Sequence, residues 1–302
     1  MVCFNTPNLK TVNDGTLFSG NAQSILGIEF PSLEYVTTPS LGNNANLIDG
    51  LSAIESLEFP ALKTIIDARF IGDCRNLKTV DLPNLETVES KVNVMTTNNA
   101  ITRVTAPKLT TCKSTVGGQF FLISNALEYL KLGSRVDVWQ AARSANVDGL
   151  HIDVEESYTS GPAYNTNNYG DYHAPKLYFD TLKKGNIRMG GSGSYSNACT
   201  YVYLGCYGNP DDEIALFYHS TCAVTDLEIR DGAKQKLTLT NFTTLTADNI
   251  VAHIFEKLAD NTYQEDGVTP AEPITITLGT ANLNKLTAEQ KAVATDKNYI
   301  LA

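Results

Sequence analysis

The chain lacks the long apolar runs and basic clusters that mark membrane and nucleic-acid-binding proteins. Among its 302 residues, no apolar segment approaches the roughly 18 residues that a membrane-spanning helix needs. The formal net charge is −10 and Lys and Arg form no block, which argues against nucleic acid as a partner. Apolar residues make up 42% and charged residues 19%, a composition typical of a folded, soluble chain.

Cysteine is too scarce and scattered for a disulfide framework. There is no Cys-x-x-Cys and no metal-finger spacing, so cysteine usage does not indicate a compartment. The first ten residues, MVCFNTPNLK, also lack the basic and apolar regions of a secretory signal peptide. The six cysteines are Cys3, Cys74, Cys112, Cys199, Cys206 and Cys222.

Motifs that carry chemistry are equally sparse. The run Asp211-Asp212-Glu213 lacks the alternating oxygen ligands of a calcium loop, and Gly190-Gly191-Ser192-Gly193 lacks the lysine of a phosphate-binding loop. We interpret these two stretches as a solvated turn and a loop, and we expect no cofactor and no metal. The histidines show no pairing at i,i+4 and no HExxH, and are interpreted as surface or packing residues: His151, His173, His219 and His253.

What the sequence does contain is a repeat. Triplets of an apolar residue, any residue and a second apolar residue recur with their centres 22–29 positions apart. Each triplet predicts a short strand whose first and third side chains share one face. A unit of this length cannot bury its apolar face alone, so the units are expected to stack as a solenoid. The ten triplet centres are Cys3, Glu29, Glu58, Asp81, Thr105, Lys131, Asp153, Tyr178, Tyr203 and Glu228.

Proline follows the strand in the first half of the chain. Proline cannot donate to a sheet ladder, so it ends the strand and turns the chain at a fixed φ. An inward leucine stands two residues after each proline, and another apolar residue follows three positions later. Each coil is therefore predicted as strand, proline corner and second buried edge, and ten coils about 4.8 Å apart would span on the order of 45 Å. The corner prolines are Pro31, Pro60, Pro83 and Pro107, and the leucines are Leu33, Leu62, Leu85 and Leu109.

The segment 70–88, FIGDCRNLKTVDLPNLETV, resembles leucine-rich repeats of the BspA-like type. Those repeats carry a Phe-Ser-Gly-Cys element followed by Leu-x-x-Val-x-Leu-Pro, and Phe18-Ser19-Gly20-Asn21 matches the first element with Asn in place of Cys. The resemblance covers about residues 7–132. From 133 to 235 the triplets persist without the proline corner, and membership there rests on the period alone.

The period breaks near residue 240, where a capping module is expected. Helical apolar spacing predicts a helix over 246–258, and Thr287 with Gln290 predicts a capping box at the start of a second helix, 287–294. Strands are expected at 274–278 and 299–302. The C-terminal block LTAEQKAVATDKNYILA resembles a module attached to similar repeat proteins of gut bacteria and their phages. Those versions have Gly and Trp where Asn298 and Tyr299 stand here.

The predicted fold is thus a mainly β, leucine-rich-repeat-like solenoid of about ten coils with a C-terminal α/β cap. We expect regular coils over 1–132, irregular coils rich in Tyr, Gly and Asn over 133–240, and the cap over 241–302. No cap precedes the first triplet, so an additional N-terminal segment or a partner chain is expected to cover the first coil. Cys199 and Cys222 should stack on neighbouring coils, and we favour thiols over a disulfide there.

Tyrosine marks the expected binding surface. Ten of the fourteen tyrosines fall between residues 158 and 218, interleaved with Gly, Ser and Asn, which is the composition of binding loops. The alternative is that rings such as Tyr201, Tyr203 and Tyr218 pack over irregular coils. The candidate ligand-binding residues are Tyr164, Tyr169, Tyr172, Tyr178, Tyr195 and Tyr203; no catalytic residue is assigned.

The resemblance implies a surface-displayed recognition protein that contacts a host or neighbour-cell protein or glycan without catalysis, outside the cell. A second hypothesis is a structural or receptor-binding component of a phage virion, which needs no secretion. The third is a polysaccharide-acting enzyme, since solenoids can be lyases and hydrolases. Adjacent acids such as Glu29, Glu58 and Asp81 would stand about 5 Å apart per coil, within the range for paired catalytic carboxylates.

Overall fold

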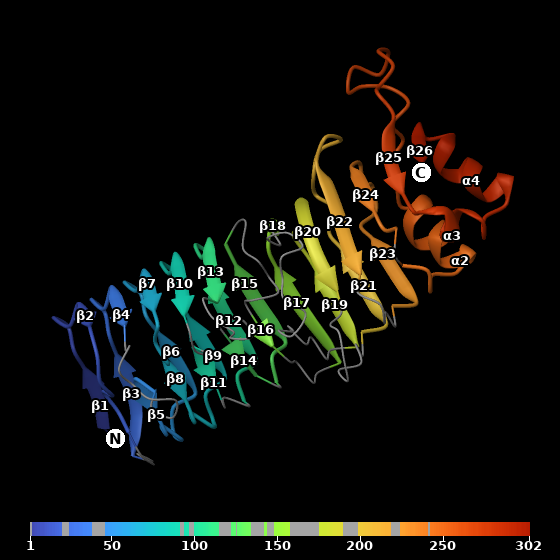
Figure 1. Cartoon of the computed structure of the whole chain (residues 1–302). Coiled ribbons are helices and arrows are strands. Elements are labelled where there is room, and N and C mark those ends of the chain that lie inside the picture. Colours follow the sequence, from blue (N-terminus) through green and yellow to red (C-terminus); the bar gives the residue numbers. More distant parts are fainter. Residues whose placement is uncertain are drawn as a thin grey trace. The chain divides into compact units, whose positions relative to one another are not determined.

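A computed structural model gives the fold as a mainly β, parallel β-solenoid of about nine turns, with a few short helices near the C-terminus (Figure 1). The chain divides into two compact units, Met1–Leu150 with Ser160–Ala174 and His151–Thr159 with Pro175–Ala302. The domain boundaries expected at residues 132 and 240 stay a prediction. The structure describes residues 2–19, 24–37, 46–90, 94–96, 100–114, 122–124, 126–133, 142–143, 148–157, 175–189, 199–218, 224–240 and 242–302.

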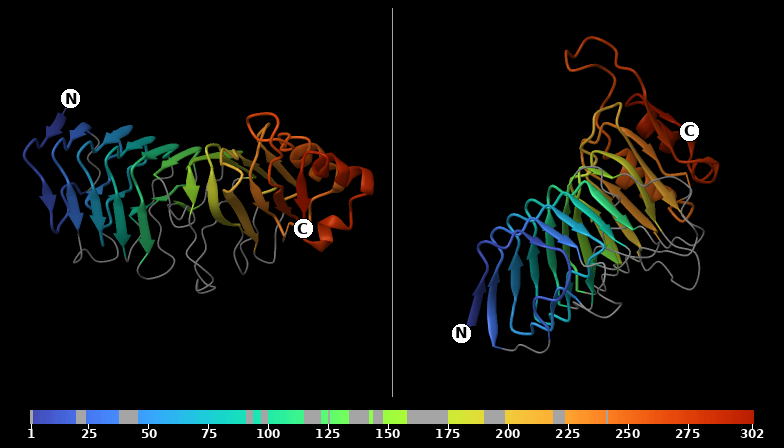
Figure 2. Two further views of the ribbon diagram at one scale, coloured as in Figure 1. Left: turned by 90° about the horizontal axis from the view of Figure 1, so that it is seen from above. Right: turned by 60° about the vertical axis from the view of Figure 1, so that its left-hand side comes forward.

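The first unit is built from stacked parallel strands that run along separate faces of the coils, as Figure 2 shows from two further sides. One ladder consists of β6 (Ser56–Glu58), β9 (Thr79–Asp81), β12 (Arg103–Ala106) and β15 (Tyr129–Leu132). A second consists of β2 (Thr11–Val12), β4 (Tyr35–Thr37), β7 (Thr64–Ile66), β10 (Thr87–Ser90) and β13 (Thr111–Ser114). A third consists of β5 (Ile48–Asp49), β8 (Ile71–Gly72), β11 (Met95–Thr96), β14 (Leu122–Ile123) and β16 (Ala142–Arg143). The first coils add the pair β1 (Val2–Asn5) and β3 (Ile25–Glu29).

The proline corners are β-turns. At Pro83, the N–H of Leu85 donates to the carbonyl oxygen of Leu82 at 3.2 Å, so proline occupies the second turn position that its fixed φ suits. The same bond closes the turns at the other three corner prolines, at 3.0–3.4 Å. The leucines after the prolines are fully buried. The strand, corner and buried-edge prediction is confirmed, and the second buried edge is itself a five-stranded sheet.

The register of the first ladder is also as predicted. Asp81 pairs with Glu58 on one side and with Thr105 on the other, and the Thr105 hydroxyl donates to Asp81 Oδ1 at 2.5 Å. The prediction that triplets far apart in the sequence become neighbours is therefore confirmed for these coils.

The first strand is shifted by two residues from the position that its triplet predicts. Asn5, not Cys3, lies beside Glu29, and Phe4 lies beside Ile28. The reason is a further proline corner: the N–H of Leu9 donates to Thr6 across Pro7, and this turn fixes where the strand ends.

In the second unit the parallel strands continue along two faces. One ladder contains β19 (Lys176–Phe179), β21 (Tyr201–Leu204) and β23 (Asp226–Ile229). The other contains β18 (Glu156–Ser157), β20 (Lys184–Met189), β22 (Glu213–Tyr218), β24 (Lys236–Thr238), β25 (Ile274–Thr277) and β26 (Tyr299–Leu301). The two strands predicted for the cap thus extend an existing sheet. The boundary between the units falls within β17 (Gly149–Asp153).

Both predicted helices are present. α2 (Ala247–Asn249) is capped by Thr246 and continues as the π-helix η1 (Ile250–Phe255), in which the N–H of Glu256 donates to Val251. α4 (Ala288–Thr295) carries the expected capping box. The four-residue α3 (Thr280–Leu283) was not predicted. Within the described part of the chain, no helix is long and apolar enough to cross a membrane.

The C-terminal turn accounts for the two departures from the resembling module. Asn298 has φ +67°, in the left-handed region where Gly is favoured and Asn is tolerated, and its amide donates to the carbonyl oxygens of Asn261 and Ala271. Tyr299 is buried, and its hydroxyl donates to Ala233 at 3.2 Å. Asn298 therefore occupies a backbone conformation that glycine would also adopt.

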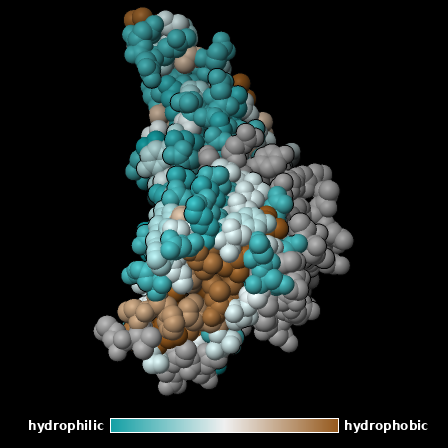
Figure 3. Space-filling model, turned by 90° about the vertical axis from the view of Figure 1, so that its left-hand side faces the viewer, coloured by the Kyte–Doolittle hydropathy of each residue, from teal (hydrophilic) through white to brown (hydrophobic). Residues whose placement is uncertain are grey.

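A column of phenylalanines runs through the first unit to its N-terminal coil. Phe4, Phe18, Phe30, Phe59 and Phe70 lie in successive contact, with ring centroids 4.7–6.3 Å apart. At the N-terminal end Phe4 is 42% exposed, whereas Phe30 is buried. Figure 3 looks toward this side and shows a patch of apolar surface there. Among the residues of the first coils that the structure describes, Leu17 and Leu26 are also large, apolar and exposed.

Candidate functional site

The candidate site is the outward face of the sheet in the second unit. Alternation along β19, β21 and β23 buries their apolar side chains and leaves every second residue half-exposed. Tyr178, Tyr203 and Glu228 pair directly across these three strands. The sequence prediction that Tyr178 and Tyr203 stack on adjacent coils is confirmed.

The residue that precedes Tyr178 in this column is His151, not the predicted Asp153. The N–H of Asp180 donates to the carbonyl oxygen of Ile152 at 3.2 Å, which sets Ile152 beside Phe179 and His151 beside Tyr178. The segment Leu150-His-Ile-Asp-Val154 contains two overlapping apolar-x-apolar triplets, so its sequence fits either register. We call His151, Tyr178 and Tyr203 the aromatic row.

The rings of the aromatic row stand against one another. His151 and Tyr178 are parallel, with ring centroids 4.3 Å apart and 4° between their planes, and Tyr178 and Tyr203 are tilted with centroids 6.4 Å apart. In this stack, one face of each of the two rings is covered by the other ring. Asp180 lies beside the row, with its Oδ2 2.8 Å from His151 Nδ1.

A third tyrosine, Tyr201, contacts the row from the neighbouring column. The Tyr201 hydroxyl donates to Glu228 Oε2 at 2.7 Å, and its ring lies 5.5 Å from that of Tyr178. Burial, and then the bond to Glu228, raises the pKa of the Tyr201 phenol. Burial, and then the nearby Tyr207 hydroxyl, raises the pKa of Tyr203. Both phenols therefore remain neutral hydrogen-bond donors at physiological pH.

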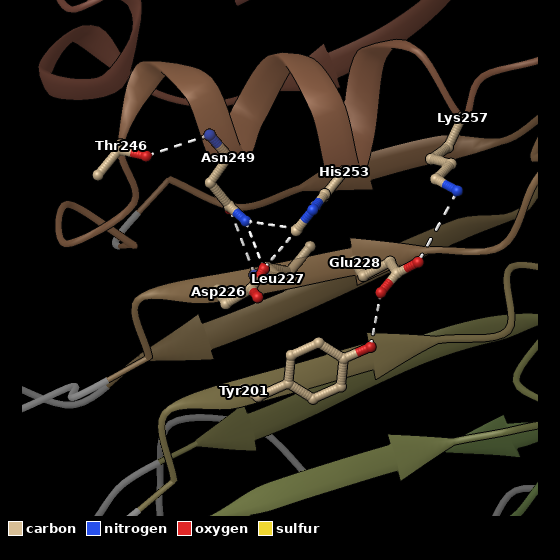
Figure 4. Close-up of polar contacts among 8 residues, drawn as sticks. All are labelled: Tyr201, Asp226, Leu227, Glu228, Thr246, Asn249, His253 and Lys257. Atoms are coloured by element: carbon tan, nitrogen blue, oxygen red, sulfur yellow. Dashed lines mark hydrogen bonds and ion pairs between the residues drawn. The ribbon is translucent and has the colours of Figure 1, made fainter.

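Helix α2/η1 borders the face at β23 (Figure 4). The Asn249 amide donates to Asp226 Oδ1, while its Oδ1 accepts the N–H of Leu227 at 3.3 Å. His253 Nδ1 lies 2.6 Å from the same Asp226 oxygen. One turn further, Lys257 lies 3.8 Å from Glu228 and 2.9 Å from Asp231. These contacts fix the helix beside the sheet, and the bond to Asn249 satisfies the backbone N–H of Leu227 in β23.

Arg230 occupies the other side of the aromatic row. Its Nε donates to the carbonyl oxygen of Gly205 at 3.1 Å, and its guanidinium lies over the Tyr207 ring, 4.1 Å from the centroid. Gly205 is required by close approach of the strands, because a Cβ there would meet the carbonyl oxygen of Asp180 at 2.4 Å. Tyr207 is 49% exposed, so the pair lies at the surface.

The structure describes two of the six predicted ligand-binding residues, Tyr178 and Tyr203, and brings them together. The other four, Tyr164, Tyr169, Tyr172 and Tyr195, lie outside the described residues, as does Tyr218 beyond its backbone. The sequence reasoning missed His151 and Arg230. Arg230 could have been found, since it stands two residues after Glu228 on the same face of the strand pattern.

The cysteine pair and the acidic turn singled out in the sequence lie outside the aromatic row. Cys199 is buried and its thiol lies 3.2 Å from the carbonyl oxygen of Tyr201, whereas Cys222, its expected neighbour, lies outside the described residues. The N–H of Asp212 donates to Asn209 across Pro210, which makes this stretch an exposed turn. In the described ranges no three His, Cys, Asp or Glu side chains could together hold a metal ion.

Comparison with known proteins gives no relative. No family model, no curated protein and no solved structure matches the chain. The chain is a β-solenoid of no identified family. Its site must therefore be interpreted from its own chemistry.

Proposed function

We propose that the chain is a non-catalytic recognition module that binds its ligand on the aromatic row. The observation that carries this proposal is the in-register row of His151, Tyr178 and Tyr203 on three neighbouring strands. A parallel sheet is a rigid support, and tyrosine offers a large amphipathic area at little rotamer cost. The neutral phenol hydroxyls and the fixed Asp180 carboxylate add hydrogen-bonding groups beside the rings.

The ligand we propose is a protein or glycan on a host or neighbouring cell, and the module would act at a cell surface. The repeats would be of the BspA-like leucine-rich type. The turn at Pro83 and the burial of Phe70 and Cys74 support this assignment, because they give a packing role to the residues that carry the resemblance.

The decisive experiment is a binding screen with matched variants. Purified chain would be applied to an array of surface glycans and proteins, and hits would be repeated with Tyr178→Ala/Tyr203→Ala and with Tyr263→Ala. Tyr263 is a 53% exposed tyrosine of the C-terminal module outside the row and serves as the control. Loss of binding in the row variant alone supports the proposal, whereas equal binding by all three proteins contradicts it.

The virion hypothesis remains the second candidate, and the apolar N-terminal end favours it. A tail component is covered by neighbouring subunits, and Phe4, Leu17 and Leu26 offer an apolar surface for such a partner or for a further segment of chain. Genes for tail proteins beside this one would support the virion. A polysaccharide-acting enzyme is the third candidate, tested by release of reducing sugar from gut polysaccharides.

A further inference from the structure

We infer that Arg230 and Tyr207 form an anion-recognising subsite beside the aromatic row, and that the ligand is a glycan bearing a carboxylate next to neutral sugars. The inference rests on the proposed function and names the ligand class of the same surface. It begins from the state of the Arg230 side chain, which is held in place on one edge and lacks a carboxylate partner among the residues that the structure describes.

The guanidinium of Arg230 is preorganised. Its Nε donates to the Gly205 carbonyl oxygen and its central carbon lies over the Tyr207 ring, so the two terminal nitrogens remain to donate as a fork. A planar fork of this kind matches the two oxygens of a carboxylate. Little rotamer entropy remains to be lost when such an anion binds.

The neighbouring cation behaves differently. Lys257, in the turn that follows helix η1, lies 2.9 Å from Asp231 and 3.8 Å from Glu228. The local acids are thus already matched: Glu228 also accepts the Tyr201 hydroxyl, and Asp226 contacts Asn249 and His253. Arg230 is therefore a group on this face that is placed to receive an external anion.

The surroundings select a ligand with few charges. Asp180 lies beside the row, Glu228 follows Tyr203 in the same column, and the chain as a whole carries a net charge of −10, so a polyanion or a strongly acidic peptide would be repelled. Carboxylates and phenol hydroxyls suit a polyhydroxylated ligand, because they accept from and donate to sugar hydroxyls. An acidic sugar between neutral sugars matches this arrangement, in which the single Arg230 guanidinium is surrounded by carboxylates and phenol hydroxyls.

The test compares each acidic glycan with its uncharged counterpart on the full chain. The probes are oligosaccharides of alternating glucuronic acid and N-acetylglucosamine with their carboxyl-reduced forms, and sialylated lactose with lactose. We expect at least one acidic form to bind about tenfold or more tightly than its counterpart, as a charge-assisted bond allows. The two pairs distinguish a uronate from a sialate as the source of the carboxylate.

The variants assign the preference to this subsite. Arg230→Met, which keeps an unbranched side chain but removes the charge, should abolish the preference for the acidic form. Arg230→Lys should restore only part of it, because the fork is lost. Tyr207→Phe should keep the preference, while Tyr207→Ala should reduce it. Thermal unfolding of each variant verifies that it is folded.

The outcomes separate this inference from the proposed function. Equal binding of acidic and neutral forms, or an acidic preference that survives in Arg230→Met, overturns the subsite. If the row variant Tyr178→Ala/Tyr203→Ala then still loses binding, the proposed function stands without it. If the chain binds neither glycan pair but does bind proteins on the array, the glycan is ruled out as the ligand. The proposal that the chain is a recognition module then stands.

Discussion

The imidazole of His151 lies parallel to the phenol ring of Tyr178, with 4.3 Å between centroids and 4° between planes. The two residues are 27 positions apart in the sequence and meet because one turn of the solenoid separates them. The contact begins the aromatic row, which continues in register through Tyr178 of β19 and Tyr203 of β21. The first prediction tests that row.

Replacing Tyr178 and Tyr203 together by Ala should weaken ligand capture about tenfold or more, because the pair forms the centre of the proposed contact surface. The two rings are half-exposed, so the melting temperature should fall by only about 2–4 °C. Surface binding assays and thermal unfolding measure the two quantities. A collapse of the melting temperature with proportionate loss of binding would show that the rings serve packing.

The contacts of Tyr201 and Lys257 predict a loss of stability in alkali. Burial raises the pKa of Tyr201 above its ordinary 10.0, and the bond to Asp231 raises that of Lys257 above 10.5. Folding therefore favours the protonated forms. Their stabilisation is fully present below those ordinary values and is lost as the pH rises through the folded values. Urea midpoints should decline above about pH 10.

Tyr201→Phe is the matched variant for the alkaline loss. It keeps the ring beside Tyr178 and removes the titrating hydroxyl, so its midpoint should decline less steeply over the same pH range than that of the unmodified chain. Identical curves for the two proteins would contradict the assignment of the alkaline loss to this phenol.

Asn298 should tolerate glycine better than alanine. Both changes remove the two hydrogen bonds of the side-chain amide, but only alanine must hold a Cβ at φ +67°, at a cost of about 1–2 kcal/mol. The free energy of unfolding should thus rank the unmodified chain first, Asn298→Gly second and Asn298→Ala third. Chemical denaturation measures the order, and a reversal of the last two contradicts the left-handed turn.

Gly205→Ala should destabilise the chain by about 1–3 kcal/mol, since the new methyl group would meet the carbonyl oxygen of Asp180 at 2.4 Å and the strands must separate. The same change should disturb Arg230, which donates to the Gly205 carbonyl. Gly232→Ala is a useful comparison, because no atom lies within 4 Å of its added Cβ and only the φ of +76° opposes it. An unaffected unfolding energy in Gly205→Ala would contradict the close approach.

The parts of the fold that could be predicted from sequence are those in which one short pattern specifies one local structure. Apolar alternation predicts a strand, Pro83 and its equivalents predict a corner, and Thr287 with Gln290 predicts the start of α4. Each depends on residues only a few positions apart. Stacking follows, because a single coil cannot bury its own apolar face.

Errors arose where the pattern admitted two solutions. The apolar residues at 150, 152 and 154 fit two registers, and hydrogen bonding to β19 selects the one that places His151 in the row. At the first coil, Pro7 indicates the correct end of the strand, since its turn repeats the one at Pro31. The candidate site was therefore predicted at Tyr178 and Tyr203 and missed at His151.

The amino-acid sequence by itself determined that this chain winds as a parallel solenoid and which strands carry tyrosine outward. Only the tertiary structure decided that Arg230 rests on Tyr207 while it donates to the carbonyl oxygen of Gly205, and that Asn249 of helix α2 and Lys257 after η1 contact Asp226 and Glu228 beside the same face. The physical reason is the separation in sequence of the residues that interact. A strand or a corner is set by the dihedral and burial preferences of neighbouring residues, whereas a surface that binds depends on side chains about 25 residues apart, whose meeting is fixed by the register of whole coils.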